Sequence, residues 1–443
     1  MNLLRNLSRA NVLALGVLAA VAIPACAQTE DDTVSSISEG LTQPITVQGV
    51  VRDASGRNVS GVTVTLSGNA WRTATTDSNG RYAFTGLNAG SYSLRASRSG
   101  CTFSPDNVNL NNLQKSVEQQ FNAFGAACQG TSAPTYRKKV MAVIQDPMVP
   151  AAGGGTVRLS AFMGWNNPLD LIEQYKNWFT TTTNGRVSFD VTIVAERDEY
   201  PVKVDGFRYT TESYLACWND RSLCHMPDNF DYNAFLTAEG GCEKVNAGLI
   251  DEIWIFGAPY FGNWESTLAG PNAYWYNSSP VTGTTCQKLL PIMGFSYERG
   301  LAEMIEDFHH RTESTMSRVY GGWQENRMQH NWDKFALVAA QSPSFGYSGC
   351  GSAHYPPNAT QDYQWDNASV AQTFCDDFLT YPNLHTPSTV LRPITCAEWG
   401  CNQVGYQTWW YRHLPAAEGV GPDGKFNDWW KYLVDPNAVF LTD

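Results

Sequence analysis

The spacing of apolar residues changes once along the chain, near residues 129–135, and this change constrains the fold more than any other feature. Before it, short runs alternate apolar and polar residues with a period of two, which is typical of half-buried strands. These runs are 45–51, 62–66 and 92–96. After it, strand-like and helix-like segments follow one another, which favours a parallel α/β sheet. They are the strands 139–144, 187–194, 251–256 and 289–293 and the helices 169–179 and 242–248.

We therefore predict a multidomain chain. A small antiparallel β-sandwich comes first, followed by an α/β domain with a mostly parallel sheet and a loop-rich, disulfide-bonded C-terminal part. The linker is assigned from its Gly, Ser, Thr and Pro content. The predicted boundaries are a signal peptide at 1–27, a polar tether at 28–44, the sandwich at 45–128, the linker at 129–135 and the α/β domain at 136–443.

Two stretches of the predicted sandwich resemble a known family. VVRDASGRNVSGVTVTLSG (50–68) and TTDSNGRYAFTGLNAGSYSLRA (75–96) are similar to the carboxypeptidase regulatory-like domain, a relative of Cna-B-type modules. The resemblance implies a transthyretin-like or carbohydrate-binding-like fold, with Asp77 and Gly80 shaping a hairpin turn. It also implies a spacer or adhesion role without catalytic residues, and it does not make the chain a carboxypeptidase.

The N-terminus has the pattern of a targeting segment. Arg5 and Arg9 precede the apolar stretch 12–25, and Ala25-Cys26-Ala27 fits a cleavage site with small residues. The same residues resemble a bacterial lipoprotein box, in which Cys26 would carry lipid. We expect an extracytoplasmic protein, and two alternatives remain open: secretion, or a lipid anchor at the bacterial cell envelope.

The number of cysteines supports export. Of 11 cysteines, ten remain when Cys26 is set aside, and an even number in an exported chain indicates disulfides. The formal net charge of −12 argues against nucleic acid as a partner, and a membrane would be contacted only through lipid on Cys26. The disulfide candidates are Cys101 with Cys128, which are the only two cysteines of the predicted sandwich, and two pairs close in sequence, Cys217 with Cys224 and Cys396 with Cys401.

The segment 298–316 carries the densest set of chemically useful side chains. Helical spacing places its apolar residues on one face and its acids and His310 on the other. Glu306, His310 and Glu313 have the spacing at which adjacent helical turns present ligands to a divalent metal. The alternative is a solvated acidic face, with pairs such as Asp307 and Arg311. His354 and His413 are the other histidines predicted to share a metal with His310.

A second hypothesis rests on acids at the ends of strands. Asp146, Glu265 and Glu298 each follow a predicted strand, and neighbouring parallel strands end at one edge of a sheet. Two carboxylates about 5–10 Å apart suit acid and base catalysis on a glycosidic bond. We expect Glu265 and Glu298 to be the acid and base of a hydrolase. The assisting residues would be Glu303 and His310, and the binding residues Trp264, Trp275 and His354.

Three functions thus remain in view. The first is a hydrolase acting on an extracellular polysaccharide through paired carboxylates. The second is a non-catalytic surface protein that binds glycan or another cell-surface polymer. The third is a metal-dependent peptidase using Glu306, His310 and Glu313, with a divalent metal as its cofactor.

Overall fold

The computed structural model describes most of the chain after residue 44. The predicted signal peptide, Cys26, the polar tether and most of the predicted linker lie outside the described residues. The described ranges are 45–53, 56–77, 79–125, 128, 135–151, 153–183, 185–323, 327–341 and 343–442.

The first part is a β-sandwich, as the period-two runs predicted. Its strands bury alternate residues, and side chains from both sheets meet in one apolar core. One sheet pairs β4 (Arg81–Leu87), β1 (Ile45–Asp53), β9 (Phe121–Phe124) and β6 (Thr102–Ser104), with β8 (Val117–Glu118) beside β1. The other has the order β3 (Arg72–Thr75), β2 (Thr63–Gly68), β5 (Gly90–Ser97) and β7 (Val108–Leu113). Most pairs are antiparallel, whereas β1 runs parallel to β8 and β9.

The second part contains the predicted, mostly parallel sheet. Its order is β13 (Val187–Arg197), β10 (Tyr136–Gln145), β14 (Glu252–Gly257), β16 (Leu290–Ser296) and β15 (Ser266–Ala269). The first four strands are parallel, and β15 runs antiparallel to β16 at the edge. The carboxyl ends of β10, β14 and β16 therefore lie at one edge of the sheet, where α/β proteins place their sites.

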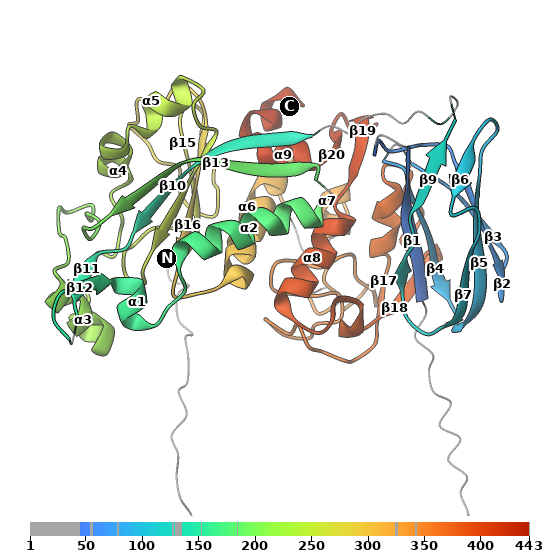
Figure 1. Ribbon diagram of the computed structural model, residues 1–443, viewed down its shortest axis with the longest axis horizontal. Helices are drawn as coiled ribbons and strands as arrows, with labels where there is room; N and C mark the ends of the chain where they lie inside the picture. The colour runs from blue at the N-terminus through green and yellow to red at the C-terminus, as the bar shows by residue number, and fades with distance from the viewer. Residues whose placement is uncertain are drawn as a thin grey trace, which may run out of the picture. The chain divides into compact units, whose positions relative to one another are not determined.

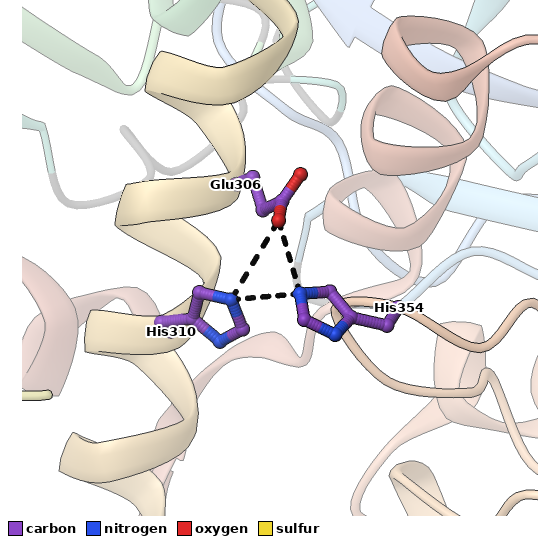
Figure 2. Close-up of side chains that lie close together, drawn as sticks. All are labelled: Glu306, His310 and His354. Atoms are coloured by element: carbon purple, nitrogen blue, oxygen red, sulfur yellow. Dashed lines mark hydrogen bonds and ion pairs between the residues drawn. The ribbon is translucent and has the colours of Figure 1, made fainter. Parts of the chain in front are cut away.

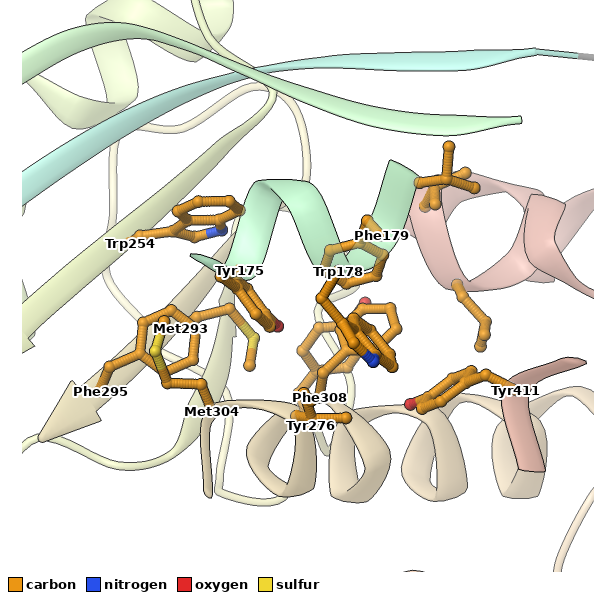
Figure 3. Close-up of a cluster of buried hydrophobic side chains, with 14 of the residues drawn as sticks. Tyr175, Trp178, Phe179, Trp254, Tyr276, Met293, Phe295, Met304, Phe308 and Tyr411 are labelled. Atoms are coloured by element: carbon orange, nitrogen blue, oxygen red, sulfur yellow. The ribbon is translucent and has the colours of Figure 1, made fainter. Parts of the chain in front are cut away.

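Helices cover both faces of this sheet (Figure 1). On one face, α2 (Pro168–Thr182) and α6 (Leu301–Val319) bury aromatic side chains against Trp254 and Phe295 (Figure 3). On the other, α4 (Tyr232–Glu239) and α5 (Gly241–Asn246) pack over Ile253. The central strand β14 is buried along its whole length because its side chains point alternately into the two layers.

The remaining elements are short and joined by loops. The helices are α1 (Leu159–Met163), α3 (Thr211–Asn219), α7 (Asn331–Phe335), α8 (Gln403–His413) and α9 (Trp430–Val434). The strand pairs are β11 (Met148–Pro150) with β12 (Thr156–Arg158), β17 (Ala371–Thr373) with β18 (Arg392–Ile394), and β19 (Ala416–Val420) with β20 (Phe426–Asp428). Single 3-10 helices span Arg221–Leu223, Cys375–Thr380, Pro387–Thr389, Cys396–Trp399 and Pro436–Leu441.

Five disulfides join the ten cysteines after Cys26. They include the three pairs expected from the sequence and two whose connectivity the sequence left open. The bonds are Cys101–Cys128, Cys217–Cys224, Cys242–Cys286, Cys350–Cys375 and Cys396–Cys401. Within the described ranges, no helix combines the length and the apolar character needed to cross a membrane.

Candidate metal centre

Three of the residues predicted to bind a metal converge on one point. Glu306 and His310 project from successive turns of α6, and His354 reaches them from a loop 44 residues further on (Figure 2). The Nε2 atom of His354 lies 3.0 Å from Nε2 of His310 and 3.0 Å from Oε1 of Glu306. The third side of the triangle, from Nε2 of His310 to Oε1 of Glu306, measures 3.8 Å.

Each imidazole has a carboxylate on its other side. The Nδ1 atom of His310 lies 3.1 Å from Oε2 of Glu313, and Nδ1 of His354 lies 3.2 Å from Oδ1 of Asp362. When each Nδ1 donates its proton to the carboxylate, each Nε2 carries a lone pair. Two lone pairs and a carboxylate oxygen then face one another, an arrangement that a cation between them stabilises. Metal-bound histidines are held by carboxylates in the same way.

Two further side chains fix Glu306. Gln403, the first residue of α8, donates from Nε2 to Oε2 of Glu306 at 2.5 Å. The hydroxyl of Tyr363 lies 3.3 Å from Oε1, and its ring packs against the His354 ring with centroids 4.3 Å apart. Tyr363 has a φ of 58°, a backbone conformation that a tyrosine rarely adopts. Glu306 therefore presents Oε1 toward the imidazoles while Oε2 is held by the amide.

The position of α6 differs from the prediction in one respect. The helix begins at Leu301, so Glu298 lies in the turn before it rather than on its first turn. Gly300 is the N-cap, and the side chain of Glu303 accepts a hydrogen bond from its backbone N–H at 3.2 Å. Glu303 thereby satisfies one of the free N–H groups at the helix start, which gives it a structural role.

The acidic face of α6 is not solvated, so that alternative reading is wrong. Glu306, Asp307 and Glu313 are only 8–9% exposed. Gln403 of α8 and His354 contact Glu306, and the backbone N–H of Ala353 contacts Glu313. The expected pair of Asp307 with Arg311 does not form either. Arg311 is fully buried, and its Nη1 lies 2.8 Å from Oε1 of Glu252 on β14.

Tight packing holds the loop that carries His354. A disulfide joins Cys350 to Cys375, and Trp410 of α8 donates from Nε1 to the carbonyl of Gly351 at 3.0 Å. Gly351 has a φ of 87°, and a Cβ there would lie 2.2 Å from a backbone oxygen, so only glycine fits. The loop is thus both disulfide-bonded, as the sequence indicated, and rigidly aimed at α6.

Glu313 joins the loop to the helix. Its Oε1 accepts a hydrogen bond from the backbone N–H of Ala353 at 2.7 Å, while Oε2 contacts Nδ1 of His310. One carboxylate therefore sets the ring orientation of His310 and also the position of the residue that precedes His354. Metal sites owe much of their preorganisation to such outer carboxylates.

The electrostatics of the cluster favour positive charge at its centre. Burial by itself raises the pKa of Glu306, but hydrogen bonds from His310 and His354 hold the pKa well below its usual range. Burial lowers the pKa of His310, yet Glu306 and Glu313 outweigh it and raise the pKa well above normal. Burial also raises the pKa of Asp307, and the charge of Glu265 adds to this. The carboxylates thus attract a proton, or equally a divalent cation.

The ligand set fits a small divalent transition metal. Glu306, His310 and His354 offer one carboxylate oxygen and two imidazole nitrogens within 4.8 Å of one another. Tetrahedral bonds of about 2.0–2.2 Å place ligand atoms about 3.3–3.6 Å apart. The measured sides of 3.0, 3.0 and 3.8 Å lie around this value. The set has two histidines and one glutamate, as in catalytic zinc sites that keep a position for water.

The acids predicted from strand ends have separate surroundings. Asp146 accepts hydrogen bonds from the backbone N–H and hydroxyl of Ser160, at 2.8 and 2.5 Å, and so fixes α1. Glu298 lies beside Arg299 at 3.9 Å. Glu265 is exposed, is held by the amide of Asn277, and is close enough to His310 for its charge to raise the pKa of that residue. The pairing of Glu265 with Glu298 as acid and base stays a prediction.

The predicted aromatic and histidine candidates divide into two groups. Trp264 and Trp275 are 49% and 58% exposed. Trp409 and His413, by contrast, are buried together, and His413 lies 3.2 Å from Asp376, so it is not part of the His310 cluster. Most of the other tryptophans after residue 320 are also core residues. Binding roles for Trp264 and Trp275 stay predictions.

Sequence reasoning missed Asp362, Tyr363 and Gln403. Asp362 and Tyr363 stand in an irregular loop, and Gln403 begins a helix 97 residues after Glu306. None of the three belongs to a periodic pattern or a spaced motif. Asp362 and Tyr363 carry one general signal, because loops placed on a rigid scaffold often carry functional side chains, whereas Gln403 carries none.

Comparisons with known proteins bear on the sandwich alone. No curated protein matches the chain. Similar solved structures include the Bacillus anthracis TIE protein, with 12% identity over 26% of this chain and 23% of that one at a TM-score of 0.18. Another is the minor pilin GBS52 of Streptococcus agalactiae, with 15% identity over 20% of this chain and 48% of that one at a TM-score of 0.17. A DUF3823 family protein from Parabacteroides merdae has 15% identity over 19% of this chain and 47% of that one at a TM-score of 0.16.

The chain thus spans less than half the length of these structures, and scores this low support no functional argument. The family match is more specific and confirms the resemblance drawn from the sequence. Residues 46–121 match the model of the carboxypeptidase regulatory-like domain.

Proposed function

We propose that this protein is an exported, metal-dependent hydrolase whose metal is held by Glu306, His310 and His354. One observation carries the proposal: the Nε2 atoms of two histidines and Oε1 of Glu306 lie 3.0–3.8 Å from one another. Each imidazole is also backed by a carboxylate, from Glu313 or Asp362. A metal between the two Nε2 atoms accounts for both parts of this arrangement, since carboxylates commonly hold the Nδ1 side of metal-bound histidines.

Hydrolysis follows from the number of ligands and their exposure. Three protein ligands leave a fourth position for water, and a bound divalent metal lowers the pKa of that water to about 7. The side chains of Glu306, His310 and His354 are 11%, 18% and 25% exposed, so the centre is reachable from solvent. A purely structural zinc site would instead be closed by four protein ligands.

We assign the role of general base for such a water to Glu265. Its carboxylate is exposed and held by Asn277, and its charge acts on His310, Asp307 and Tyr363. The sequence analysis assigned Glu265 a catalytic role together with Glu298. In the present proposal Glu265 works with the metal, and Glu298, beside Arg299, takes no part in catalysis.

Export is supported by the covalent structure. Five disulfides stabilise a chain in an oxidising compartment, whereas cytosolic thiols are kept reduced. Secretion and lipid anchoring through Cys26 both fit this requirement. We propose an extracellular or cell-surface polymer as its substrate.

Metal analysis of the purified protein tests the proposal. After dialysis against a trace of zinc, the wild-type chain should retain about one equivalent, measured by inductively coupled plasma mass spectrometry. Glu306→Gln, His310→Ala and His354→Ala should each retain much less. The matched control is His385→Ala, because His385 also contacts a carboxylate, Asp377 at 2.6 Å, but stands outside the cluster.

Three results would count against the proposal. Zinc that remains in all three ligand variants would place the metal elsewhere. A wild-type chain that binds no divalent metal would favour the non-catalytic surface protein considered from the sequence. Selective retention of iron would also fit two histidines and one carboxylate, and would point to oxygen chemistry in place of hydrolysis.

A further inference from the structure

A groove opens beside the metal centre and shares two of its residues. His310 and Glu313 line a cavity of about 610 Å³, together with residues of the 274–277 turn and of the last part of α6. This volume lies in the range of small-molecule and oligomer subsites. The groove thus runs from an aromatic turn to His310, the one proposed metal ligand among the residues that line it.

Trp275 is held outward at the rim of this groove. It is 58% exposed, while its neighbours Tyr274 and Tyr276 are 9% and 0% exposed. The hydroxyl of Tyr276 accepts a hydrogen bond from Nε of the buried Arg311 at 2.8 Å. Because both neighbours are anchored in the core, the Trp275 ring cannot turn inward. The exposed ring is therefore available to stack on a ligand in the groove.

Short polar side chains face the same groove. Ser314 and Ser317 lie one turn apart on α6, and the backbone N–H of Asn277 donates to Oγ of Ser314 at 3.1 Å. An aromatic platform beside hydroxyl and amide groups matches a sugar ring, which has an apolar face and a rim of hydroxyls. The groove is lined by one acid, Glu313, and one arginine, Arg318, so no excess of cations selects a polyanion there, and the net charge of −12 also disfavours one.

A peptide fits this groove less well. Extended peptides commonly bind by adding a strand to an open sheet edge. The edge strand here, β15, is already covered: Val281 donates from its backbone N–H to the carbonyl of Leu268 at 3.0 Å, and Thr267 donates its hydroxyl to the carbonyl of Ser279 at 3.0 Å. At Thr267 and Leu268, the edge of β15 is therefore occupied and a substrate chain could not add there as a further strand.

We infer that the groove bounded by Trp275, Ser314, Ser317 and His310 binds a neutral glycan chain and leads it to the metal centre. The inference rests on the proposed function for what happens to the bound chain, and it names the class of substrate. A sugar stacked on Trp275 would hold the chain in register, so that a neighbouring glycosidic or ester bond lies at the metal. Binding itself requires the groove and not the metal.

Affinity electrophoresis of the full-length protein tests the inference. The probes are soluble xylan, galactomannan, mixed-linkage β-glucan, starch and glycol chitin, each cast into a native gel. At least one should retard the wild-type protein, and Trp275→Ala should weaken that binding about tenfold, a typical loss for one stacked aromatic ring. Glu306→Gln should bind the same glycan normally, so a failure of the metal proposal would leave this result unaffected.

The control is Trp71→Ala, which removes a tryptophan that is 76% exposed in the β-sandwich. It should leave glycan binding intact. Loss of binding in Trp71→Ala together with normal binding in Trp275→Ala would place the glycan on the sandwich and overturn the inference. Failure of all five probes to retard the wild-type protein would also overturn it. So would binding of denatured casein that depends on Trp275 in the absence of any glycan binding.

Discussion

Nε2 of His310 and Nε2 of His354 lie 3.0 Å apart, although the two residues belong to different elements and are 44 positions apart in the chain. Two imidazoles held this close, each backed by a carboxylate, need a proton or a metal cation between their Nε2 atoms, because two facing lone pairs would repel. This relationship connects α6 to the loop at 350–355, and several measurable consequences follow from it.

Asp362, whose carboxylate contacts Nδ1 of His354, should affect the affinity for the metal. Asp362→Asn removes the charge that faces Nδ1 of His354 at 3.2 Å and leaves all three ligands in place. Loss of such a partner lowers metal affinity about 10–100-fold. Competition with a chromophoric chelator measures this change. Asp366→Asn, four residues further along the same loop, is the control and should bind metal like the wild type.

Metal should stabilise the fold, because the site joins a helix to a separate loop. A ligand at about 100 times its Kd adds about 2.7 kcal/mol to the free energy of unfolding. Thermal denaturation followed by circular dichroism should therefore show a higher Tm with zinc than with a chelator. Glu306→Gln should show a much smaller difference. Equal Tm values for the wild-type protein in both conditions would contradict the predicted coupling.

The buried pair of Arg311 and Glu252 should matter for folding rather than for catalysis. Both side chains are nearly inaccessible, at 0% and 4%, and their charged atoms lie 2.8 Å apart. Arg311→Met leaves Glu252 without this partner, and breaking such a pair lowers stability by about 3–5 kcal/mol. Denaturant unfolding measures the loss. The double variant with Glu252→Gln should recover part of it, whereas Arg57→Met, in a partly exposed pair, should change little.

Asp376 should make the free energy of unfolding depend on pH. Burial raises the pKa of this carboxyl. The charge of Arg392 and hydrogen bonds from His413 and Arg392 outweigh the effect of burial and hold the pKa well below its usual range. A carboxyl whose pKa is lowered on folding stabilises the protein above the unfolded pKa, near 3.9, and loses that effect as the pH falls below it. Urea midpoints measured between pH 6 and pH 3 should fall less steeply for Asp376→Asn than for the wild type.

The regular parts of this architecture could be predicted from the sequence. The strands around Val140, Ile253 and Ile292 are short apolar runs, and parallel order followed from their alternation with helices. The i,i+4 spacing of Glu306 and His310 also indicates, by helical geometry alone, that these two ligands share one face of a helix. Local period and spacing carry this information because they depend on neighbours within one or two turns.

The environment of the acidic helix face could not be predicted in the same way. Burial of Glu306 depends on Gln403 and on the loop of His354, which are distant in sequence. A charged stripe looks the same in the sequence whether water or another element covers it. The predicted helix start was wrong by three residues for a related reason, since Gly300 and Glu303 form a cap that the sequence did not suggest.

The last prediction separates the two catalytic hypotheses that use Glu265. If Glu265 is the base of a metal-dependent hydrolase, Glu265→Gln should lower the rate about 10²–10⁴-fold while zinc content stays at the wild-type level. Glu298→Gln should then behave like the wild type, because that side chain lies beside Arg299 at 3.9 Å. The assay is the release of reducing ends from the neutral glycan that retards the wild-type protein. Paired carboxylates would instead make both variants inactive and leave activity independent of zinc. Full activity of Glu265→Gln would exclude this residue from either mechanism, since neither tolerates the loss of its charge.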